Sequence, residues 1–224
     1  MPEVSACIIT AAGASTRFGE DKIFKPILGR PLVEWSLKPF LEYPEITEII
    51  LVFRAEVLDR ARSLFKGDKI RAIVSGGETR ELSVLNGFRE IKDAEYVLVH
   101  DGDRPCLTSQ LVRRVLEELK SYPAVIPACP VKETIKACNS EMLVSRTLGK
   151  NYWCAQTPQG FKREILEEAF QEVELISEIP DDSELVEKLG LPVKVIRGEE
   201  TNIKVTTPFD FKIAEMILKE RAGA

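Results

Sequence analysis

Two aspartates and an arginine stand directly after an apolar stretch near the middle of the chain. The residues Tyr-Val-Leu-Val-His over 96–100 lead into Asp101-Gly102-Asp103-Arg104-Pro105. Because Mg²⁺ binds one or two carboxylates together with substrate phosphates, Asp101, closest to the apolar stretch, is the predicted metal ligand. Asp103 either assists it or pairs with Arg104. The alternative is an ordinary Asp-Gly turn. His100 is expected to pack or hydrogen-bond beneath this loop rather than act in catalysis.

A loop of small residues near the N-terminus is the predicted phosphate-binding element. It follows an apolar stretch and reads Ala11-Ala12-Gly13-Ala14, which lets backbone N–H groups approach a phosphate closely. Arg17 then supplies a planar cationic fork and Lys22 a second positive charge. The GxxxxGK[ST] and GxGxxG motifs are absent, so the common ATPase and dinucleotide-binding interpretations lose their support. A purely structural turn is the alternative.

Two further segments carry candidate binding residues. The first reads Ser75-Gly76-Gly77-Glu78-Thr79-Arg80 and is followed by Ser83. Its glycines permit close backbone approach, and its polar side chains suit a base and ribose or a phosphate, although a helix N-terminus with an acidic first turn is equally good physics. The second segment holds Lys204 between β-branched neighbours, which predicts that the lysine points the opposite way, into a cleft. Taken alone, it is an edge strand with a solubilising lysine.

Bulk composition excludes several classes of protein. The chain has 224 residues and a net charge of −5, so nucleic acid is not an expected partner, because such proteins usually carry a basic face. No signal peptide and no apolar run near the roughly 20 residues of a membrane span are visible. One histidine excludes most histidine-based metal and triad chemistry. The five scattered cysteines favour reduced thiols and a cytoplasmic location.

Short apolar stretches must position these residues, and they alternate with amphipathic ones. Strands rich in Val and Ile are predicted over 4–10, 48–53, 71–74, 96–100, 124–127 and 193–196. Helices are predicted over 31–41, 56–65, 80–91 and 109–119, and at the C-terminus after an N-cap at Thr207. Several strands are apolar on both faces, which is typical of a parallel sheet covered by helices. The order therefore predicts an α/β fold with a doubly wound, mostly parallel sheet.

The segment 131–153 breaks this alternation. Its polar and apolar residues follow no helical period, so we expect an extended arm or hairpin that leaves the main sheet. A long surface loop is the alternative. Nothing resembling a linker divides the rest of the chain, so residues 1–224 are expected to form a single domain.

Six segments taken in order resemble one protein family. They are AAGASTRFG with Lys22, GGETR with Ser83, VHDGDRPC, PVKETIK, QTPQGF and NIKVT. The set is similar to the 2-C-methyl-D-erythritol 4-phosphate cytidylyltransferases over nearly the whole chain. The resemblance implies a Rossmann-like domain with a β-arm that makes a homodimer. It also implies an enzyme that uses Mg²⁺ and joins CTP to methylerythritol phosphate, giving the CDP-alcohol and pyrophosphate in non-mevalonate isoprenoid biosynthesis.

The resemblance assigns roles to residues of this sequence. Arg17 and Lys22 match the family's basic pair on the triphosphate, and Asp101 matches its metal ligand. The nucleotide site then comprises the first loop, Gly102 and the cytosine-ribose loop with Gly76, Gly77, Glu78, Arg80 and Ser83. The acceptor site comprises Arg104, Thr134, Lys150 and Lys204. In that site, Lys204 matches the lysine that positions the acceptor phosphate, and Thr134 an arm threonine that reaches the partner subunit's acceptor.

The chain departs from the family pattern at several places. The family usually has DAARP where this chain has Asp101-Gly102-Asp103-Arg104-Pro105, and Asp where this chain has Glu78. It usually has an arginine at the place of Gly149, so Lys150 is the predicted substitute. A TD pair usually stands at Pro180-Asp181, and the spacing from Arg17 to Lys22 is short. These departures bear more on which alcohol is used than on the reaction.

Three other functions remain open from the sequence. A ribitol 5-phosphate cytidylyltransferase more often carries DGxRP, as here, although its first loop tends towards AGG. A sugar-1-phosphate nucleotidyltransferase would use another base. A non-catalytic nucleotide-binding regulator would bind without releasing pyrophosphate.

Overall fold

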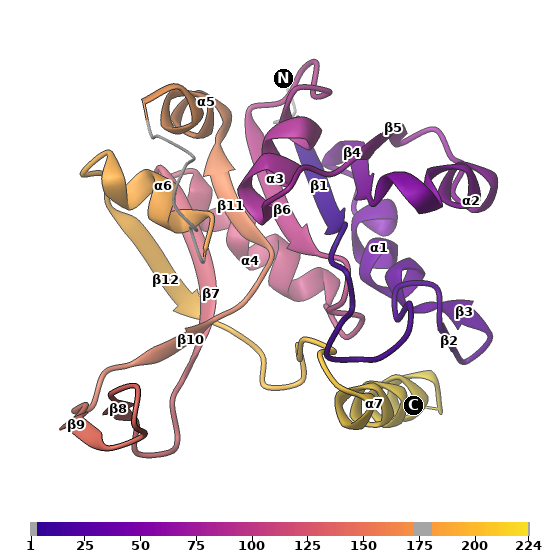
Figure 1. Cartoon of the computed structure of the whole chain (residues 1–224). Helices are drawn as coiled ribbons and strands as arrows, with labels where there is room; N and C mark the ends of the chain where they lie inside the picture. The colour runs from indigo at the N-terminus through magenta and orange to yellow at the C-terminus, as the bar shows by residue number, and fades with distance from the viewer. Residues whose placement is uncertain (1–3, 173–180, 224) are drawn as a thin grey trace.

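A computed structural model describes residues 4–172 and 181–223 (Figure 1). Within these residues, eight strands form one sheet in the order β10-β7-β11-β6-β1-β4-β5, with β12 on the other edge of β7. The strands are β1 (Ser5–Ala11), β4 (Ile46–Phe53), β5 (Ile70–Ser75), β6 (Tyr96–Asp101), β7 (Ala124–Pro130), β10 (Trp153–Ala155), β11 (Gln159–Lys162) and β12 (Val193–Arg197).

The predicted parallel core of the sheet is confirmed. Strand β1 pairs in parallel with β4 and β6, and β4 pairs in parallel with β5. Successive side chains of a strand point to opposite faces, so Cys7 and Ile9 of β1 enter one apolar cluster while Ala6 and Ile8 enter another. Because both faces of β1, β4 and β6 are largely buried, these three strands appear in the sequence as nearly continuous apolar runs.

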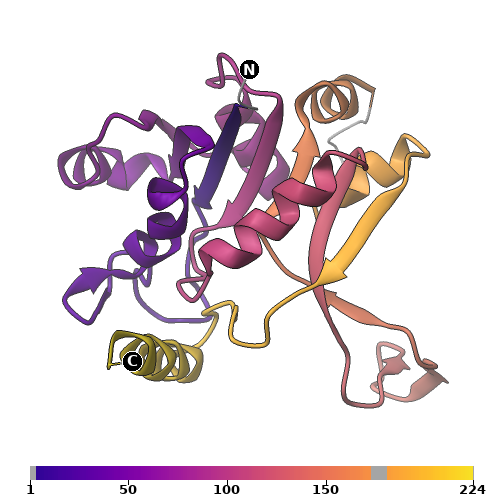
Figure 2. The same cartoon turned by 180° about the vertical axis from the view of Figure 1, so that it is seen from behind.

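Helices cover both faces of the sheet (Figures 1 and 2). On one face lie α1 (Leu32–Glu42), α2 (Leu58–Leu64) and α4 (Ser109–Leu119). On the other lie α3 (Arg80–Phe88), α5 (Arg163–Glu172) and α6 (Ser183–Lys188). Each large apolar side chain buried between a helix and the sheet contributes about 1.5–3 kcal/mol. The expected doubly wound α/β fold is therefore confirmed.

Three helix starts use side-chain caps, and the one at Thr207 was predicted from the sequence. Thr108 Oγ1 accepts a hydrogen bond from Leu111 N at 3.1 Å at the start of α4. Thr79 Oγ1 accepts from Leu82 N at 3.2 Å at the start of α3. At the start of α7 (Pro208–Gly223), Asp210 Oδ2 accepts from Thr207 N at 2.7 Å and Asp210 N donates to Thr207 Oγ1 at 3.3 Å, which is a capping box.

The structure corrects the sequence interpretation at several elements. The helix predicted over 80–91 ends at Phe88, and the one predicted over 56–65 divides into a 3₁₀ turn, Ala55–Val57, and α2. Strand β11 was not predicted, and it runs antiparallel to both β6 and β7. A Cβ added at Gly160 would meet Val115 Cγ1 at 2.6 Å and Leu119 Cδ1 at 2.7 Å. Close packing of α4 therefore explains this glycine, which weakens the strand pattern in the sequence.

The segment 131–153 contains a hairpin that projects from the sheet (Figure 1). Strands β8 (Lys136–Cys138) and β9 (Val144–Thr147) pair with each other and with no other strand among the residues described. We call 131–153 the arm, as expected from the sequence. Its tip residues Met142 and Leu143 are 79% and 61% exposed.

A second small hairpin joins β2 (Pro26–Ile27) and β3 (Arg30–Pro31). Over the described ranges, no helix has both the length and the apolar character to span a bilayer.

Candidate active site

The loops after β1, β5 and β6 meet at one end of the parallel core and enclose a cavity of about 340 Å³. This is where open α/β sheets bind ligands. The cavity brings together most of the predicted site residues, namely Ala11, Ala12, Gly13, Ala14, Lys22, Gly77, Glu78, Arg80, Ser83, Asp101 and Lys204. Residues from four distant parts of the chain therefore share one pocket, as the sequence motifs predicted.

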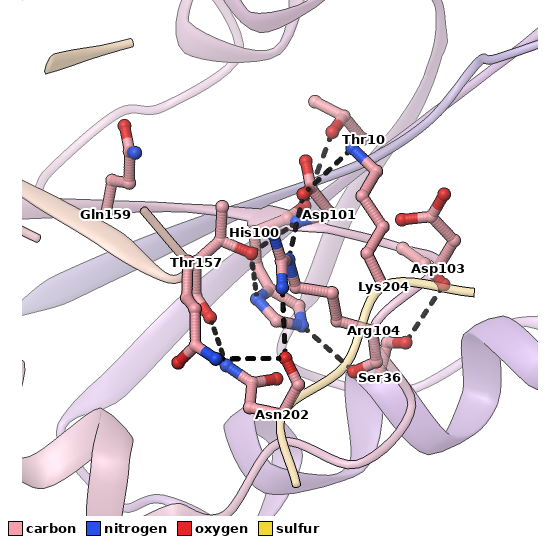
Figure 3. A network of polar contacts seen from close by, with 12 residues as sticks. Thr10, Ser36, His100, Asp101, Asp103, Arg104, Thr157, Gln159, Asn202 and Lys204 are labelled. Atoms are coloured by element: carbon pink, nitrogen blue, oxygen red, sulfur yellow. Dashed lines mark hydrogen bonds and ion pairs between the residues drawn. The ribbon is translucent and has the colours of Figure 1, made fainter. Parts of the chain in front are cut away.

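Asp101 lies at the centre of a cluster of cations (Figure 3). Its Oδ2 accepts from Arg104 Nε at 3.0 Å and from Lys204 Nζ at 3.1 Å. Its Oδ1 accepts from Arg80 Nη2 at 3.4 Å. Burial alone would raise the pKa of Asp101, but Lys204, Arg80 and Arg104 together hold that pKa well below its ordinary value. The carboxylate is therefore ionised and fixed in place before any ligand arrives.

Arg80 joins this centre to a second buried carboxylate that the sequence analysis missed. Arg80 Nη1 lies 2.7 Å from Asp182 Oδ1, and the Asp182 side chain is fully buried. Burial raises the pKa of Asp182, whereas Arg80 opposes that shift. Removing water from a charge costs several kcal/mol unless a partner offsets it, so each partner fixes the other. Arg80 is thereby held at the cavity wall.

Lys22 is anchored by the residue after Gly102. Lys22 Nζ donates to Asp103 Oδ2 at 2.6 Å and to Val205 O at 2.7 Å. Val205 N donates in turn to Asp103 O at 2.8 Å. Of the two alternatives for Asp103, the pair with Arg104 is wrong, because Arg104 pairs with Asp101 and the first loop brings Lys22 to Asp103. An ammonium has three donors, so Lys22 keeps one for a ligand in the cavity.

His100 supports the acidic loop from beneath, as expected. Its Nδ1 lies 2.8 Å from Thr157 Oγ1, which also accepts from Asp101 N at 3.1 Å. Its ring packs against Phe40 with centroids 5.3 Å apart. Burial lowers the pKa of His100 to about 3, so the imidazole is neutral near neutral pH. Asn202 Nδ2 donates to Thr157 O at 2.8 Å and completes this support. A neutral, fully buried imidazole has no role in proton transfer at the cavity.

Several predicted residues lie outside the cavity lining. Arg17 is exposed on the loop between β1 and β2. Arg104 lies behind Asp101, where its Nη1 donates to Asn202 O at 3.0 Å. Gly76 and Gly102 are packed against the first loop: an added Cβ would meet Ala12 Cβ at 2.5 Å and Ala11 Cβ at 3.0 Å, respectively. These two glycines therefore let the loops approach one another.

The arm residues Thr134 and Lys150 lie apart from the Asp101 cavity. Both are exposed and line a separate hollow of about 490 Å³ formed by residues 130–135 and 148–153. Gly149, at the place of the family's usual arginine, lies in the same hollow and has open space around its Cα. The predicted acceptor residues of this chain therefore fall into two groups, Lys204 in the cavity and Arg104 just behind it, and Thr134 and Lys150 on the arm.

The segment 202–206 reaches the cavity without forming a strand. Lys204 points from it towards Asp101, as the alternation predicted, while Asn202 and Val205 bind the loops on either side. The sequence offered a signal for Thr157 and Asn202 in the QTPQGF and NIKVT segments. It offered none for Asp182, which only its contact with Arg80 reveals. Of the departure noted at Pro180-Asp181, Pro180 lies outside the described residues.

Comparison with known proteins identifies the family of this chain. The profile of the 2-C-methyl-D-erythritol 4-phosphate cytidylyltransferase family matches residues 5–220. A protein of that name from Dehalococcoides mccartyi is 40% identical over 97% of both chains. The crystal structure of a 4-diphosphocytidyl-2C-methyl-D-erythritol synthase from Anaerococcus prevotii matches with a TM-score of 0.83 and 32% identity over 97% of both chains. A Thermus thermophilus cytidylyltransferase structure matches with a TM-score of 0.76 and 32% identity, covering 97% of this chain and 99% of its own.

The family match covers residues 5–220, and the cavity carries most of the nucleotide-site residues on which the resemblance rested. The chain is a nucleotidyltransferase and belongs to the 2-C-methyl-D-erythritol 4-phosphate cytidylyltransferase family.

Proposed function

We propose that this protein transfers a cytidylyl group from CTP to 2-C-methyl-D-erythritol 4-phosphate and releases pyrophosphate. The observation that carries the proposal is the convergence of Lys22, Arg80 and Lys204 on a cavity walled by the small-residue loop Ala11–Ala14. Small residues admit a nucleotide's phosphates against backbone N–H groups, and fixed cations complement them. The names of the relatives supply the acceptor.

The reaction needs no general base. The second pKa of a phosphate monoester is about 6, so its oxygen is ionised near neutral pH and attacks the α-phosphorus in line. This fits a site whose one histidine is buried and neutral. Catalysis then consists of positioning and of stabilising charge on the transferred group. Lys22 and Arg17 offset the charge that grows on the α-phosphate and pyrophosphate, and Lys204 holds the acceptor phosphate beside CTP.

The carboxylates of the cavity fit a magnesium ion. Asp101 and Asp103 both line it, and Asp103 Oδ1 is buried without a hydrogen-bond partner. No group of three or more His, Cys, Asp or Glu side chains suited to a metal gathers among the described residues. The metal's other ligands would therefore be phosphate oxygens and water, as Mg²⁺ prefers. Bound Mg²⁺ would neutralise triphosphate charge, with Asp101 as its main protein ligand and Asp103 Oδ1 as the second.

The arm would complete the acceptor site of a second subunit in a homodimer. Thr134 and Lys150 line a hollow that belongs to the arm and not to the chain's own cavity. The arm also carries exposed apolar side chains at Met142, Leu143 and Val144. Exposed apolar surface of this kind marks a contact surface. We therefore place Thr134 and Lys150 of one subunit at the acceptor of its partner.

Pyrophosphate release from CTP and Mg²⁺ tests the proposed reaction, with methylerythritol 4-phosphate, ribitol 5-phosphate or no acceptor added. Release only with methylerythritol phosphate is expected. Release only with ribitol phosphate would reject the acceptor but keep the reaction. If no pyrophosphate is released in any of the three reactions while calorimetry still detects CTP binding, the protein is a nucleotide-binding regulator. Repeating the assay with EDTA tests the metal, because activity that survives chelation would reject it.

A further inference from the structure

Two cysteines face each other where the arm joins the sheet. In the antiparallel pair of β7 and β10, Cys129 lies directly opposite Cys154. Residues directly opposite each other in such a pair project from the same face of the sheet. Both thiols are free in the structure. The pair therefore brings two reactive side chains together that are far apart in the sequence.

The local hydrogen bonds define the geometry of this pair. Val131 N donates to Tyr152 O at 2.9 Å, and Gln156 N donates to Pro127 O at 2.8 Å. Hydrogen-bonded pairs alternate along an antiparallel ladder, so the cysteines, midway between these two bonds, occupy a hydrogen-bonded position. The Cα atoms of such a pair are about 5.5 Å apart, which lies within the range of about 4.4–6.8 Å that a disulfide spans. The Cβ atoms at a hydrogen-bonded position are also about 5.5 Å apart and must approach to about 4.5 Å, so the bond requires a small shift of β10.

The surroundings make the pair accessible. Cys154 is exposed, and Cys129 is half-buried. The ladder of β7 and β10 is only three residues long, so small shifts of β10 meet little resistance. Burial raises the pKa of Cys129, while Arg197 opposes that shift. Since a thiolate is the attacking species, the exposed Cys154 should react first with an external oxidant.

We propose that Cys129 and Cys154 are a reversible modification site, and that a small-molecule disulfide converts them to a cross-strand disulfide at the root of the arm. The bond would join the two strands that lead into and out of the arm. It would enclose the arm in a covalent loop, with Thr134 and Lys150 inside it. This inference rests on the strand register and on the exposure of the two thiols, and it does not depend on the proposed substrates.

The chemistry balances with oxidised glutathione as the oxidant. The Cys154 thiolate attacks one sulfur of glutathione disulfide, forms a mixed disulfide and releases one glutathione thiolate. The Cys129 thiolate then attacks Cys154 Sγ and displaces the second glutathione. The two protons from the cysteines pass to the two glutathione thiolates. The protein loses two electrons and two protons, and glutathione disulfide gains them.

Mass spectrometry of the intact, full-length protein tests the inference. After native protein is treated with oxidised glutathione and its free thiols are blocked, we expect one chain that carries two fewer blocking groups than an untreated chain blocked in the same way. Trypsin should then release Ser121–Lys132 linked to Asn151–Lys162, since each of these peptides holds one of the two cysteines. Dithiothreitol should separate them.

Matched variants give the control. Cys138 is exposed on the arm itself, so Cys138→Ser should form the same linked peptide in the same yield. Cys129→Ser should instead keep glutathione on Cys154, because no second thiol resolves it. Any of three results in the native wild-type chain would overturn the inference: a lasting glutathione adduct on Cys154, a linked peptide containing Cys138, or a disulfide between two chains.

Discussion

The cavity around Asp101 and the arm differ in how their functional side chains are held. In the cavity, the Asp101 side chain is 7% exposed and touches three cationic side chains of its own chain. On the arm, Met142 and Leu143 are 79% and 61% exposed, and the predicted functional residues Thr134 and Lys150 face solvent. The cavity is assembled within one chain, whereas the arm presents its side chains to solvent.

Buried charge explains the difference. An ionised group that leaves water is costly unless its partners are in place, so the cations around Asp101 must be fixed by folding itself. The arm carries no buried charge and packs on little besides its own hairpin. Nothing in the described part of its own chain forces its side chains into one arrangement. Substitutions in the cavity should therefore lower stability or kcat, whereas substitutions on the arm should change only the KM for the acceptor.

The largest effect is expected from Lys22→Ala in the cavity. We expect kcat to fall at least about a hundredfold, the size typical of losing one preorganised charge at a transition state. Steady-state cytidylyl transfer measures it. Arg17→Ala should show a similar loss although Arg17 is exposed, because the proposal places both residues on the triphosphate. An unchanged kcat in both variants would reject their role, and a loss in Lys22→Ala alone would restrict it to the anchored residue.

Arg80→Ala should cost the protein stability as well as activity. It leaves Asp182 buried without its cation, and we expect the free energy of unfolding to fall by about 2 kcal/mol, less than for a wholly buried pair because Arg80 keeps some exposure. Urea denaturation measures it. The exposed Arg113–Glu117 pair on α4 gives the control: Arg113→Ala should cost at most about 0.5 kcal/mol. Adding Asp182→Asn to Arg80→Ala should recover part of the loss.

If Arg80→Ala and Arg113→Ala destabilise the protein equally, the buried pair has no special importance. That result would reject the idea that buried charge pairs fix the cavity more firmly than the arm is fixed.

The sequence predicted the parallel core well and the antiparallel strands poorly. Strands buried on both faces, such as β1 and β4, carry their own signal as runs of Val and Ile. Strand β11 contains Gln159 and Gly160, and its place is set by pairing with β6 and β7 and by the close approach of α4. Such tertiary constraints leave little trace in local composition.

The sequence also predicted only part of the candidate active site. The loops after strands were predictable because ligands bind at the carboxyl ends of parallel strands. The pairing within the site was not, because it depends on which distant side chains meet. Asp103 was expected either to assist Asp101 or to pair with Arg104, and the pairing that the structure shows is with Lys22. Asp182 carried no motif at all.

The pH dependence of stability should reveal the buried His100. Its pKa is about 3 in the folded protein and about 6.5 when unfolded, so the unfolded chain binds more protons between these values. Stability is therefore complete above pH 6.5 and is lost as the pH falls towards 3. For this group alone we expect a loss of about 1 kcal/mol between pH 6.5 and 5.5. Urea denaturation across this range measures it.

His100→Asn provides the control for that slope. The variant should be less stable at pH 7 but should lack the His100 contribution between pH 6.5 and 5.5. Asp101 does not interfere, because its lowered pKa places its own loss of stability below the ordinary carboxyl range. An equal slope in both proteins would show that His100 is not the group that titrates.

The smallest effect is expected on the arm, and it distinguishes the two regions most directly. Lys150→Ala should raise the KM for the acceptor about fivefold, the value of one solvent-accessible contact of about 1 kcal/mol, while kcat, the KM for CTP and urea stability stay unchanged. Lys136→Ala is the matched control, since this arm lysine bonds only Thr147 on its own hairpin among the contacts described, and it should change none of these quantities.

The Lys150→Ala substitution should affect the acceptor KM only at the cavity of the partner subunit. Mixing Lys150→Ala chains with Lys22→Ala chains therefore tests the exchange: in a mixed dimer, the subunit with intact Lys22 receives an arm with intact Lys150, and its acceptor KM should return to the wild-type value. If that KM stays raised, each arm serves its own chain, and the contrast drawn between the two regions is wrong.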